Sequence, residues 1–336
     1  MKRILYIGNN FTPKSKYNST LTTLSNLLKS EGFTIDIVSD KQNQIIRLFH
    51  MCYSVVKHRK VDFMLVDTFS TSGFYFAFFT SQIARFFKIK YIPILHGGNL
   101  PNRIKKSTKF SKMIFDNSFN NVAPSNYLKS AFEKEGYQVS FIPNTIEIDN
   151  YKFKMRKTFS PKILWVRAFH ETYNPTMAIE VIKRLKPDFP DCMLTMVGPV
   201  KDNSLDVCKD LVAVYELEKN VNFTGVLAQE KWHKLSEDFD IFINTTNFDN
   251  TPLSVIESMA LGLPIISTNV GGLNFLIDDG VDGQLLEKND VDAMADKIKF
   301  SINNPDVIRE IVIAARHKVE QFDWKKVRNK WFEVLK

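Results

Sequence analysis

The sequence predicts an α/β protein built from two doubly wound parallel sheets. Short apolar runs of strand length alternate with amphipathic stretches of helical length, which is the pattern of parallel sheets covered by helices. The alternation stops in the polar and basic segment 145–161 and then starts again. A chain of 336 residues is long enough for two domains of ordinary size. We therefore expect a first domain over 1–150, a second over 151–322, and a last amphipathic helix, 323–336, that packs back on the first domain.

The individual elements follow from the spacing of apolar residues. In the first half, strands are expected over 2–8, 33–39, 61–67, 90–97, 120–125 and 138–144, and helices over 18–32, 44–60, 73–87, 109–118 and 126–136. The most apolar stretch, 73–87, is interrupted by polar residues and is expected to be a buried helix. In the second half, strands are expected over 162–167, 192–198, 220–225 and 240–246, and helices over 174–189, 204–219, 228–239, 290–304 and 305–322. Because ligands of open α/β sheets lie at the carboxyl ends of strands, we expect a site in a cleft where two such edges face each other.

The stretch 249–272 reads as a loop, a helix, a strand and a glycine-rich turn. Thr251 is a suitable N-cap, and Pro252 suits the first helical position, where its missing N–H costs nothing. The helix is expected to end at Gly262, before a short strand over 264–268. Such a helix start offers free backbone N–H groups and the positive end of a helix dipole, so it favours an anion such as a phosphate.

Two carboxylates frame this helix start. Asp249 precedes it, and Glu257 lies eight positions further on among apolar residues, where a carboxylate needs partners. Ser254 and Glu257 stand three apart and could form a capping box. The residues alone leave a plainer interpretation open, in which Asp249 and Ser254 only cap the helix and Glu257 faces solvent.

Composition narrows the class of protein. Three scattered cysteines, without a CxxC pair or a histidine cluster, indicate a reducing compartment and no structural zinc. The first apolar run is too short for a signal peptide, and no run reaches the roughly 18 residues that span a bilayer, so a cytoplasmic protein is expected. The absence of GxGxxG argues against a dinucleotide-dependent dehydrogenase. DFD at 238–240 imitates a metal motif but lies at a helix-to-strand junction, so no metal is expected.

Several short motifs follow one another along the second half, and their order indicates a family. They are ILWVR ending at Arg167, LTMVG at 194–198, DNTPLSVIESMALGLPIISTNVGG at 249–272 and DDGVDGQLL at 278–286, and HGG at 96–98 adds a thinner match upstream. In this order the chain resembles the retaining glycosyltransferases of family 4, which have the GT-B fold of two facing Rossmann-like domains. It departs from them at Asp249, where the family usually has Glu, and at 172–174, where a Lys-Gly pair is missing.

The resemblance implies transfer of a sugar from a nucleotide diphosphate sugar, by family habit a UDP-sugar, to a hydroxyl of a glycan or lipid-linked acceptor. Retention of configuration, independence of metals and other cofactors, and a place in bacterial surface polysaccharide synthesis belong to the same implication. Fixed positive charge and N–H donors would stabilise the departing diphosphate. The implied catalytic residues are His96 and Asp249, and the implied donor-binding residues are Arg167, Asn250, Thr251, Pro252, Leu253, Ser254 and Glu257. Arg167 would bind phosphate, Glu257 the ribose hydroxyls, and Asp249 and His96 the donor sugar.

Charge is unevenly spread along the chain. Residues 1–150 carry 20 basic and 10 acidic side chains, whereas residues 151–336 carry 25 and 27, so the first half is expected to meet an anionic partner. In the segment 102–115, Lys105, Lys109 and Lys112 are expected to share one helical face beside apolar residues. We expect this face either to dock on anionic lipid at the inner face of the plasma membrane or to be an ordinary solvated surface. Nucleic acid is not expected, because no platform of interleaved aromatic and basic residues stands out.

Two other functions stay open at this level. A catalytically silent GT-B homologue that binds nucleotide or a partner enzyme is supported by the missing lysine and by Asp249. Another GT-B enzyme, such as a sugar-nucleotide epimerase, is disfavoured by the two acids at 249 and 257.

Overall fold

The computed structural model describes residues 2–10 and 19–336, and it separates into two compact units. Unit 1 contains the residues up to Thr145 together with Trp324–Lys336, and unit 2 contains Ile146–Asp323. Asn18, the first residue of the helix expected over 18–32, lies outside the described residues. The division falls five residues before position 150, because Ile146 is already buried in the core of unit 2 and pairs with Asp323 in a parallel bridge.

Unit 1 is built on a six-stranded sheet in the order β2-β1-β3-β4-β5-β6, and all its strand pairs are parallel. Its strands are β1 (Arg3–Ile7), β2 (Thr34–Val38), β3 (Phe63–Thr68), β4 (Lys90–Leu95), β5 (Val122–Ala123) and β6 (Ser140–Phe141). The winding changes direction at β1, which lies between β2 and β3. This confirms the doubly wound arrangement that the alternating pattern predicts.

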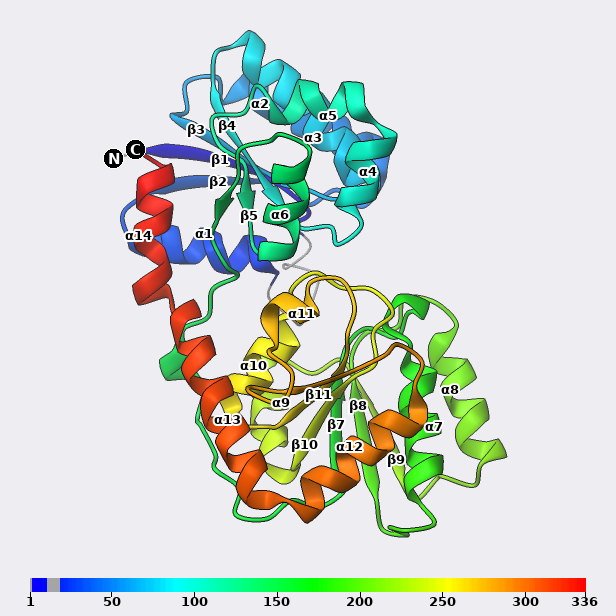
Figure 1. Ribbon diagram of the computed structural model, residues 1–336. Helices are drawn as coiled ribbons and strands as arrows, with labels where there is room; N and C mark the ends of the chain where they lie inside the picture. Colours follow the sequence, from blue (N-terminus) through cyan, green and yellow to red (C-terminus); the bar gives the residue numbers. More distant parts are fainter. Residues whose placement is uncertain (1, 11–18) are drawn as a thin grey trace. The chain divides into compact units, whose positions relative to one another are not determined.

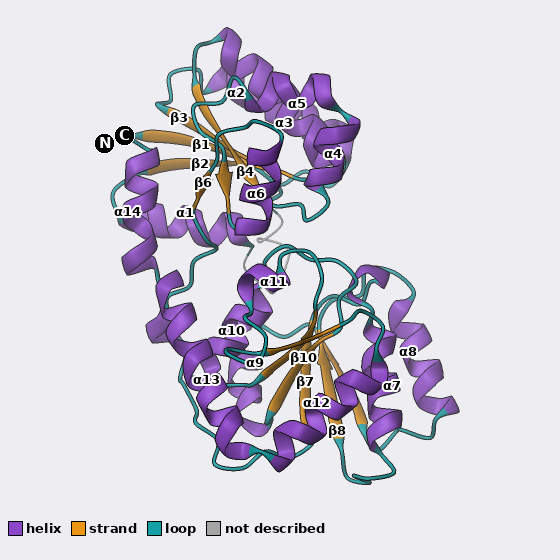
Figure 2. Cartoon of the chain, in the orientation of Figure 1, coloured by secondary structure: helices purple, strands orange, loops and turns teal. Residues whose placement is uncertain are grey.

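Helices cover both faces of this sheet (Figures 1 and 2). They are α1 (Thr20–Ser30), α2 (Gln44–Lys57), α3 (Ser72–Phe86), α4 (Leu100–Lys106), α5 (Thr108–Phe115), α6 (Asn126–Lys134) and α14 (Trp324–Val334). Successive residues of β1 alternate between the two faces. Ile4 and Tyr6 belong to the core beneath α1 and α14, whereas Leu5 and Ile7 belong to the core beneath α2 and α3. A strand that is buried on both faces is a continuous apolar run, which is why its position could be predicted.

Two helix predictions in unit 1 are wrong in part. The basic segment 102–115 does not form one helix, because α4 ends at Lys106 and α5 starts at Thr108 with a non-helical Ser107 between them. Lys105 therefore does not share a helical face with Lys109 and Lys112. The stretch expected as a buried helix, 73–87, forms α3 but leaves three of its aromatic side chains exposed, namely Tyr75, Phe79 and Phe86.

Unit 2 is built on a second parallel sheet of six strands, in the order β12-β11-β10-β7-β8-β9. Its strands are β7 (Lys162–Val166), β8 (Met193–Val197), β9 (Val221–Gly225), β10 (Ile241–Asn244), β11 (Ile265–Thr268) and β12 (Gln284–Leu286). The segment 278–286 contains a tight turn that leads into β12, which pairs with β11 in parallel as the edge strand. The chain winds outward from β7 to β9, returns to β10 beside β7, and winds outward again, which places the switch point between β7 and β10.

The helices of unit 2 divide between the two faces of its sheet. They are α7 (Pro175–Leu185), α8 (Ser204–Val214), α9 (Gln229–Leu235), α10 (Leu253–Leu261), α11 (Leu273–Leu276), α12 (Val291–Asn303) and α13 (Pro305–Val319), with 3₁₀ turns η2 (Ile148–Asn150), η3 (Glu171–Tyr173), η4 (Ser236–Asp238) and η5 (Glu320–Phe322). One core contains residues of α7, α8 and α12, and the opposite core contains residues of α9, α10 and α13. Helix α10, whose residues 254–261 are all buried, is therefore fixed directly on the sheet.

Candidate functional site

The predicted site residues of unit 2 gather at its switch point. Arg167 directly follows β7, and the segment 245–252 connects β10 to α10. The two strands are neighbours in the sheet, so their carboxyl ends meet at one edge. Hydrogen bonds tie the segment to η3: Asn247 N–H donates to Thr172 O at 2.8 Å, and Thr245 Oγ1 donates to Tyr173 O at 2.9 Å. The place where the sequence lacks a lysine is thus a 3₁₀ turn that braces the loop after β10.

Arg167 forms an ion pair with Asp249, a contact that the sequence did not predict. The guanidinium also lies 4.4 Å from the centroid of the Tyr173 ring, and its Nε atom is buried without a hydrogen-bond partner. Burial lowers the pKa of the Arg167 side chain from its usual value, and the neighbouring Tyr173 opposes this shift. The backbone of Arg167 passes so close to Gly198 that a Cβ at position 198 would lie 1.7 Å from Arg167 O.

The glycine pair at 271–272 holds the backbone of the acidic loop, by which we mean the segment 245–252 that carries Asp249. A Cβ on Gly271 would lie 2.0 Å from Asp249 O, and a Cβ on Gly272 would lie 2.0 Å from Asn250 O. Gly272 N–H donates to Asp249 O at 3.1 Å. Asp249 is fixed from its side chain as well, because its Oδ1 accepts the N–H of Asn250 at 2.8 Å. The glycines therefore set the position of Asp249 through close backbone contact.

Helix α10 begins at Leu253, with Pro252 in the N-cap position, so the predictions of Thr251 as N-cap and Pro252 as first helical residue are wrong by one position. No side chain caps this helix, and the capping box of Ser254 with Glu257 is not formed. The Oγ atom of Ser254 is buried without a hydrogen-bond partner. A helix start without a side-chain cap keeps its first N–H groups available to an anion, and those of Leu253 and Ser254 lie here.

Glu257 does not face solvent, since only 8% of it is exposed. Its Oε1 accepts hydrogen bonds from the Tyr151 hydroxyl at 3.0 Å and from the Gln229 amide, and His233 Nε2 lies 3.8 Å away. Burial, followed by the charge of Glu257, raises the pKa of Tyr151 well above its usual value. The sequence indicated that Glu257 needs partners but did not identify them. Gln229 and His233 are four apart on one helix face, which is a usable signal, whereas Tyr151 lies in the segment expected as a linker.

Unit 1 carries a separate polar cluster at its own switch point. His96 follows β4, as predicted, and its Nε2 lies 2.8 Å from Asp67 Oδ1. The same oxygen accepts the Tyr6 hydroxyl at 2.9 Å, and the Phe69 ring stacks on the His96 ring at 5.3 Å. Burial, followed by the charge of Asp67, raises the pKa of Tyr6 well above its usual value. Neither partner of this cluster was predicted, although a carboxylate that closes an apolar strand at the carboxyl edge of a sheet is a recognisable signal.

Asp240, the residue of the DFD motif nearest to a strand, has structural partners. It precedes β10, and its carboxylate accepts the N–H of Ser160 at 3.1 Å and lies 3.4 Å from Arg156 Nε. Among the described residues, no group of three or more His, Cys, Asp or Glu side chains could hold a metal ion. Over the same residues, no helix is both long and apolar enough to cross a bilayer.

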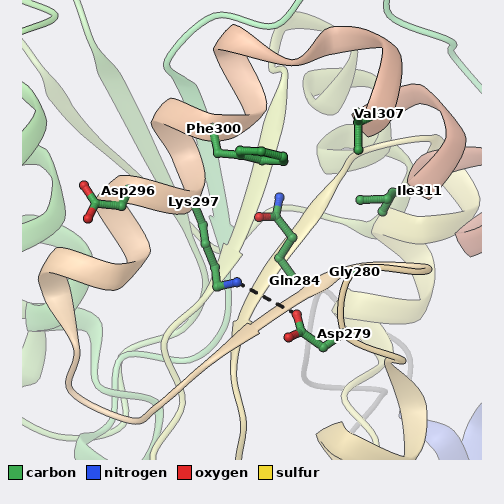
Figure 3. A pocket seen from close by; sticks show the side chains of 8 residues that line it. All are labelled: Asp279, Gly280, Gln284, Asp296, Lys297, Phe300, Val307 and Ile311. Atoms are coloured by element: carbon green, nitrogen blue, oxygen red, sulfur yellow. Dashed lines mark ion pairs between the residues drawn. The ribbon is translucent and has the colours of Figure 1, made fainter.

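A groove of about 510 Å³ lies elsewhere in unit 2, between the turn before β12 and helices α12 and α13 (Figure 3). Three of its polar side chains have partners: Lys297 pairs with Asp279 at 3.9 Å, and the Gln284 amide donates to Ser301 Oγ at 2.9 Å. None of the predicted site residues lines it.

Two Rossmann-like units, each with polar residues at its switch point, make up the GT-B fold. The structure of Anabaena HepE in complex with UDP and glucose superimposes on the whole chain with a TM-score of 0.77 at 16% identity, covering 99% of HepE. The chain belongs to the family of glycosyl transferases group 1, whose model matches residues 147–318.

Relatives in sequence carry glycosyltransferase names. An uncharacterized glycosyltransferase of Haemophilus influenzae is 27% identical over 194 residues, which are 57% of this chain and 53% of the relative. The amylovoran biosynthesis glycosyltransferase AmsK of Erwinia amylovora is 29% identical over 184 residues, 52% of this chain and 44% of AmsK. The matched part thus spans about half the length of these relatives.

Proposed function

We propose that this protein is a retaining glycosyltransferase that moves a sugar from a nucleotide diphosphate sugar, most simply a UDP-sugar, to a hydroxyl of a glycan or lipid-linked acceptor. The observation that carries the proposal is the placement of Arg167 beside Asp249 and the uncapped start of α10 at one switch point. Membership in the glycosyl transferases group 1 family and the UDP and glucose in the HepE structure support the same chemistry.

The roles follow from charge and hydrogen-bonding capacity. The guanidinium of Arg167 and the N–H groups of Leu253 and Ser254 would stabilise the charge that develops on the departing diphosphate. Glu257 would accept the ribose hydroxyls of the nucleotide, and its hydrogen bonds to Tyr151 and Gln229 would hold it in place. Asn250, Thr251 and Pro252 would shape the loop that receives the diphosphate.

Asp249 and His96 would orient the donor sugar, which makes their contribution positional. In the reaction, the bond between the anomeric carbon and the phosphate oxygen breaks, and its electron pair stays on that oxygen. The acceptor hydroxyl oxygen bonds to the same face of the anomeric carbon, and its proton passes to the departing phosphate oxygen. These steps need no metal ion and no redox cofactor. None of these roles requires a nucleophilic side chain.

The biological setting is proposed from the names of relatives. AmsK is a glycosyltransferase of amylovoran biosynthesis, so we propose that this protein acts in bacterial surface polysaccharide synthesis at the inner face of the plasma membrane. The exposed lysines of the segment 102–115 would contact anionic headgroups near a lipid-linked acceptor.

The test is to incubate the protein with candidate nucleotide sugars and measure the released nucleotide. Glu257→Ala is expected to raise the dissociation constant for UDP by about tenfold or more, since hydrogen bonds to a charged group are worth about 1.5–3 kcal/mol. The exposed acid Glu310 of unit 2 supplies a matched control, and Glu310→Ala should leave UDP binding unchanged. No release of nucleotide from any donor, with UDP binding intact, would favour the alternative of a catalytically silent homologue. That alternative has two supports in the sequence, the absence of a lysine in η3 and the aspartate at position 249.

A further inference from the structure

The helices α2, α3 and α5 of unit 1 present an exposed face that is both apolar and basic. Helix α2 packs against α3, and α3 packs against α5, so the three lie side by side (Figure 1). We name their outward side the aromatic face, defined by Ile45, Ile46, Phe49, Tyr53, Val56, Tyr75, Phe79, Phe86 and Phe110. All of these side chains are exposed. Contiguous apolar surface of this kind marks an interaction site in soluble domains.

Helix α2 carries apolar side chains on two opposite sides. Met51 and Val55 pack into the core, whereas Phe49 and Tyr53 point away from it with 69% and 65% of their surface exposed. The exposed apolar residues of α2 follow the spacing i, i+1, i+4, i+8 and i+11 from Ile45, which places them on one side of the helix. A helix that only covers a sheet would present polar residues on that side.

Helix α3 repeats the pattern. Tyr75, Phe79 and Phe86 follow the spacing i, i+4 and i+11, and Phe86 is 80% exposed. The face continues onto α5 through ring contacts, because Phe78 lies 5.2 Å from Phe79 and 4.7 Å from Phe110 between ring centroids. The aromatic face therefore extends over three helices.

The helices of this face carry basic side chains and no acidic ones, and the nearest exposed acids in sequence are Asp62 and Asp116. Residues 68–115, which include α3, α4 and α5, contain eight Lys and Arg and no Asp or Glu, and residues 41–61, which include α2, contain five Lys and Arg and again no acid. Exposed basic side chains lie at the ends of α2 and α3 and along α5, namely Lys57, Arg59, Lys60, Arg85, Lys88, Lys109 and Lys112. Their partner must therefore be both apolar and anionic.

We infer that the aromatic face inserts into the headgroup region of an anionic lipid bilayer, with the surrounding lysines and arginines on the lipid phosphates. Aromatic side chains favour the membrane–water interface, and each basic residue near an anionic surface strengthens binding. A second copy of the chain is a poorer fit, since two such faces would bring like charges together. This inference deepens the proposed function and rests on its membrane location, to which it adds the insertion of the aromatic face of α2, α3 and α5.

The first experiment is flotation with vesicles, which needs no sugar donor and so can fail independently of the proposed activity. The protein is expected to float with vesicles of phosphatidylglycerol and phosphatidylcholine, and more weakly with phosphatidylcholine alone. The pair Lys109→Gln and Lys112→Gln should weaken binding to the anionic vesicles by about fivefold for each lysine removed. Lys219→Gln with Lys231→Gln, two exposed lysines of unit 2, is the matched control and should have no effect.

The second experiment measures insertion directly. Lipids with brominated acyl chains should quench the fluorescence of the tryptophan introduced by Phe49→Trp. They should not quench the tryptophan introduced by Phe300→Trp, at a partly exposed position of unit 2. The four native tryptophans are all buried, so brominated lipids should quench their fluorescence little, and the wild type gives the background signal. Phe49→Ser combined with Phe86→Ser should reduce vesicle binding at least tenfold without lowering the thermal midpoint, because both side chains lie outside the core. Absence of flotation at low salt would overturn the inference, and so would a concentration-dependent dimer that the same serine variants abolish.

Discussion

His96 and Asp67 are joined by a 2.8 Å contact between Nε2 and Oδ1 at the carboxyl edge of the first sheet. Because a carboxylate can only accept, the contact requires a proton on Nε2 of His96. Tyr6 donates to the same oxygen at 2.9 Å, so Asp67 links the end of β4 to β1. This carboxylate therefore decides which nitrogen of His96 is free to act as an acceptor.

Asp67→Asn tests this relationship. An amide can donate as well as accept, so we expect the proton of His96 to shift from Nε2 to Nδ1 in a measurable fraction of molecules. NMR spectra of the imidazole nitrogens report the tautomer, and sugar transfer should fall by at least about tenfold while the KM for the donor changes little. Tyr6→Phe removes the other hydrogen bond of Asp67 and should leave the tautomer unchanged. An unaltered imidazole spectrum in Asp67→Asn would show that Asp67 does not set the state of His96.

Asp249→Asn should change nucleotide binding and turnover in opposite directions. The carboxylate pairs with Arg167, so its neutralisation releases the guanidinium for the diphosphate. We expect UDP to bind about five- to tenfold more tightly, which corresponds to about 1–1.4 kcal/mol. Sugar transfer should nevertheless fall, because the donor sugar loses a charged acceptor. Calorimetric titration with UDP measures the first effect, and nucleotide release measures the second.

The control for this variant is Asp292→Asn, which removes the acid of the exposed pair with Arg184 in the same unit. Asp292→Asn should alter neither the affinity for UDP nor the rate of nucleotide release. Weaker UDP binding in Asp249→Asn would mean that Asp249 organises the nucleotide site instead of competing for its arginine.

Gly272→Ala tests the close approach of the glycine pair to the acidic loop. The backbone at Gly272, with φ −89° and ψ 0°, suits any residue, so only the 2.0 Å approach to Asn250 O opposes the methyl group. Forcing an extra group into such a space costs about 1–3 kcal/mol. We expect the free energy of unfolding, measured in urea, to fall by that amount. UDP should also bind more weakly, because Asn250 must move.

Gly280→Ala separates this effect from the general cost of losing a glycine. Its backbone has φ +74°, but nothing lies within 4 Å of the added carbon. The variant should lose a little stability and keep its affinity for UDP. Equal affinities for UDP in the two variants would remove the proposed link between the glycine pair and the nucleotide.

Alkaline pH should reveal the buried hydroxyl of Tyr151. Its pKa in the folded protein is raised above the ordinary value of 10.0, first by burial and then by the charge of Glu257. A raised pKa means that the folded state holds the proton more tightly than the unfolded state. The stabilisation is therefore fully present below pH 10 and is lost as the pH rises towards the raised pKa.

Urea unfolding measured between pH 9 and pH 11 gives the slope of the free energy of unfolding against pH. The wild type should lose up to about 1.4 kcal/mol per pH unit above pH 10 from this one group. Tyr151→Phe should remove that part of the slope and cost stability at neutral pH, where the hydrogen bond to Glu257 is intact. Identical slopes in the two proteins would indicate that Tyr151 ionises freely in the folded state.

The sequence predicted the fold well because both sheets are buried on two sides. Strands such as β1 and β7 are continuous apolar runs, and their alternation with helices leaves few topologies. It also indicated where Arg167, Asp249 and Glu257 lie along the chain, since Arg167 follows β7, Asp249 precedes α10 and Glu257 lies within that helix. The contacts among them are a different matter. Whether Arg167 meets Asp249, or Glu257 meets Tyr151, depends on the register of chain segments that are far apart in sequence.

Helix boundaries and exposed faces were predicted least well. The break at Ser107 leaves no glycine or proline signal, so Lys105 was expected to share a helical face with Lys109 and Lys112 although it lies on a separate helix. In α2 and α3, apolar periodicity occurs on two sides of one helix, so the pattern alone does not tell which side packs inward. The aromatic face became visible only once the core of unit 1 was known.

Helix α14 has a consequence for the order in which the protein can be completed. Trp324, Val327 and Trp331 lie in the same core as Ile4 and Leu28, so residues from the first and last parts of the chain share one interior. Since synthesis runs from the N-terminus, the first sheet emerges early, but one of its sides is covered only in part, by α1, until α14 has left the ribosome. Unit 2 lies entirely between these segments and can close its own cores first. Unit 1 therefore begins to fold first but is completed last. A chaperone would be needed most while the side of its sheet that α14 covers is still exposed.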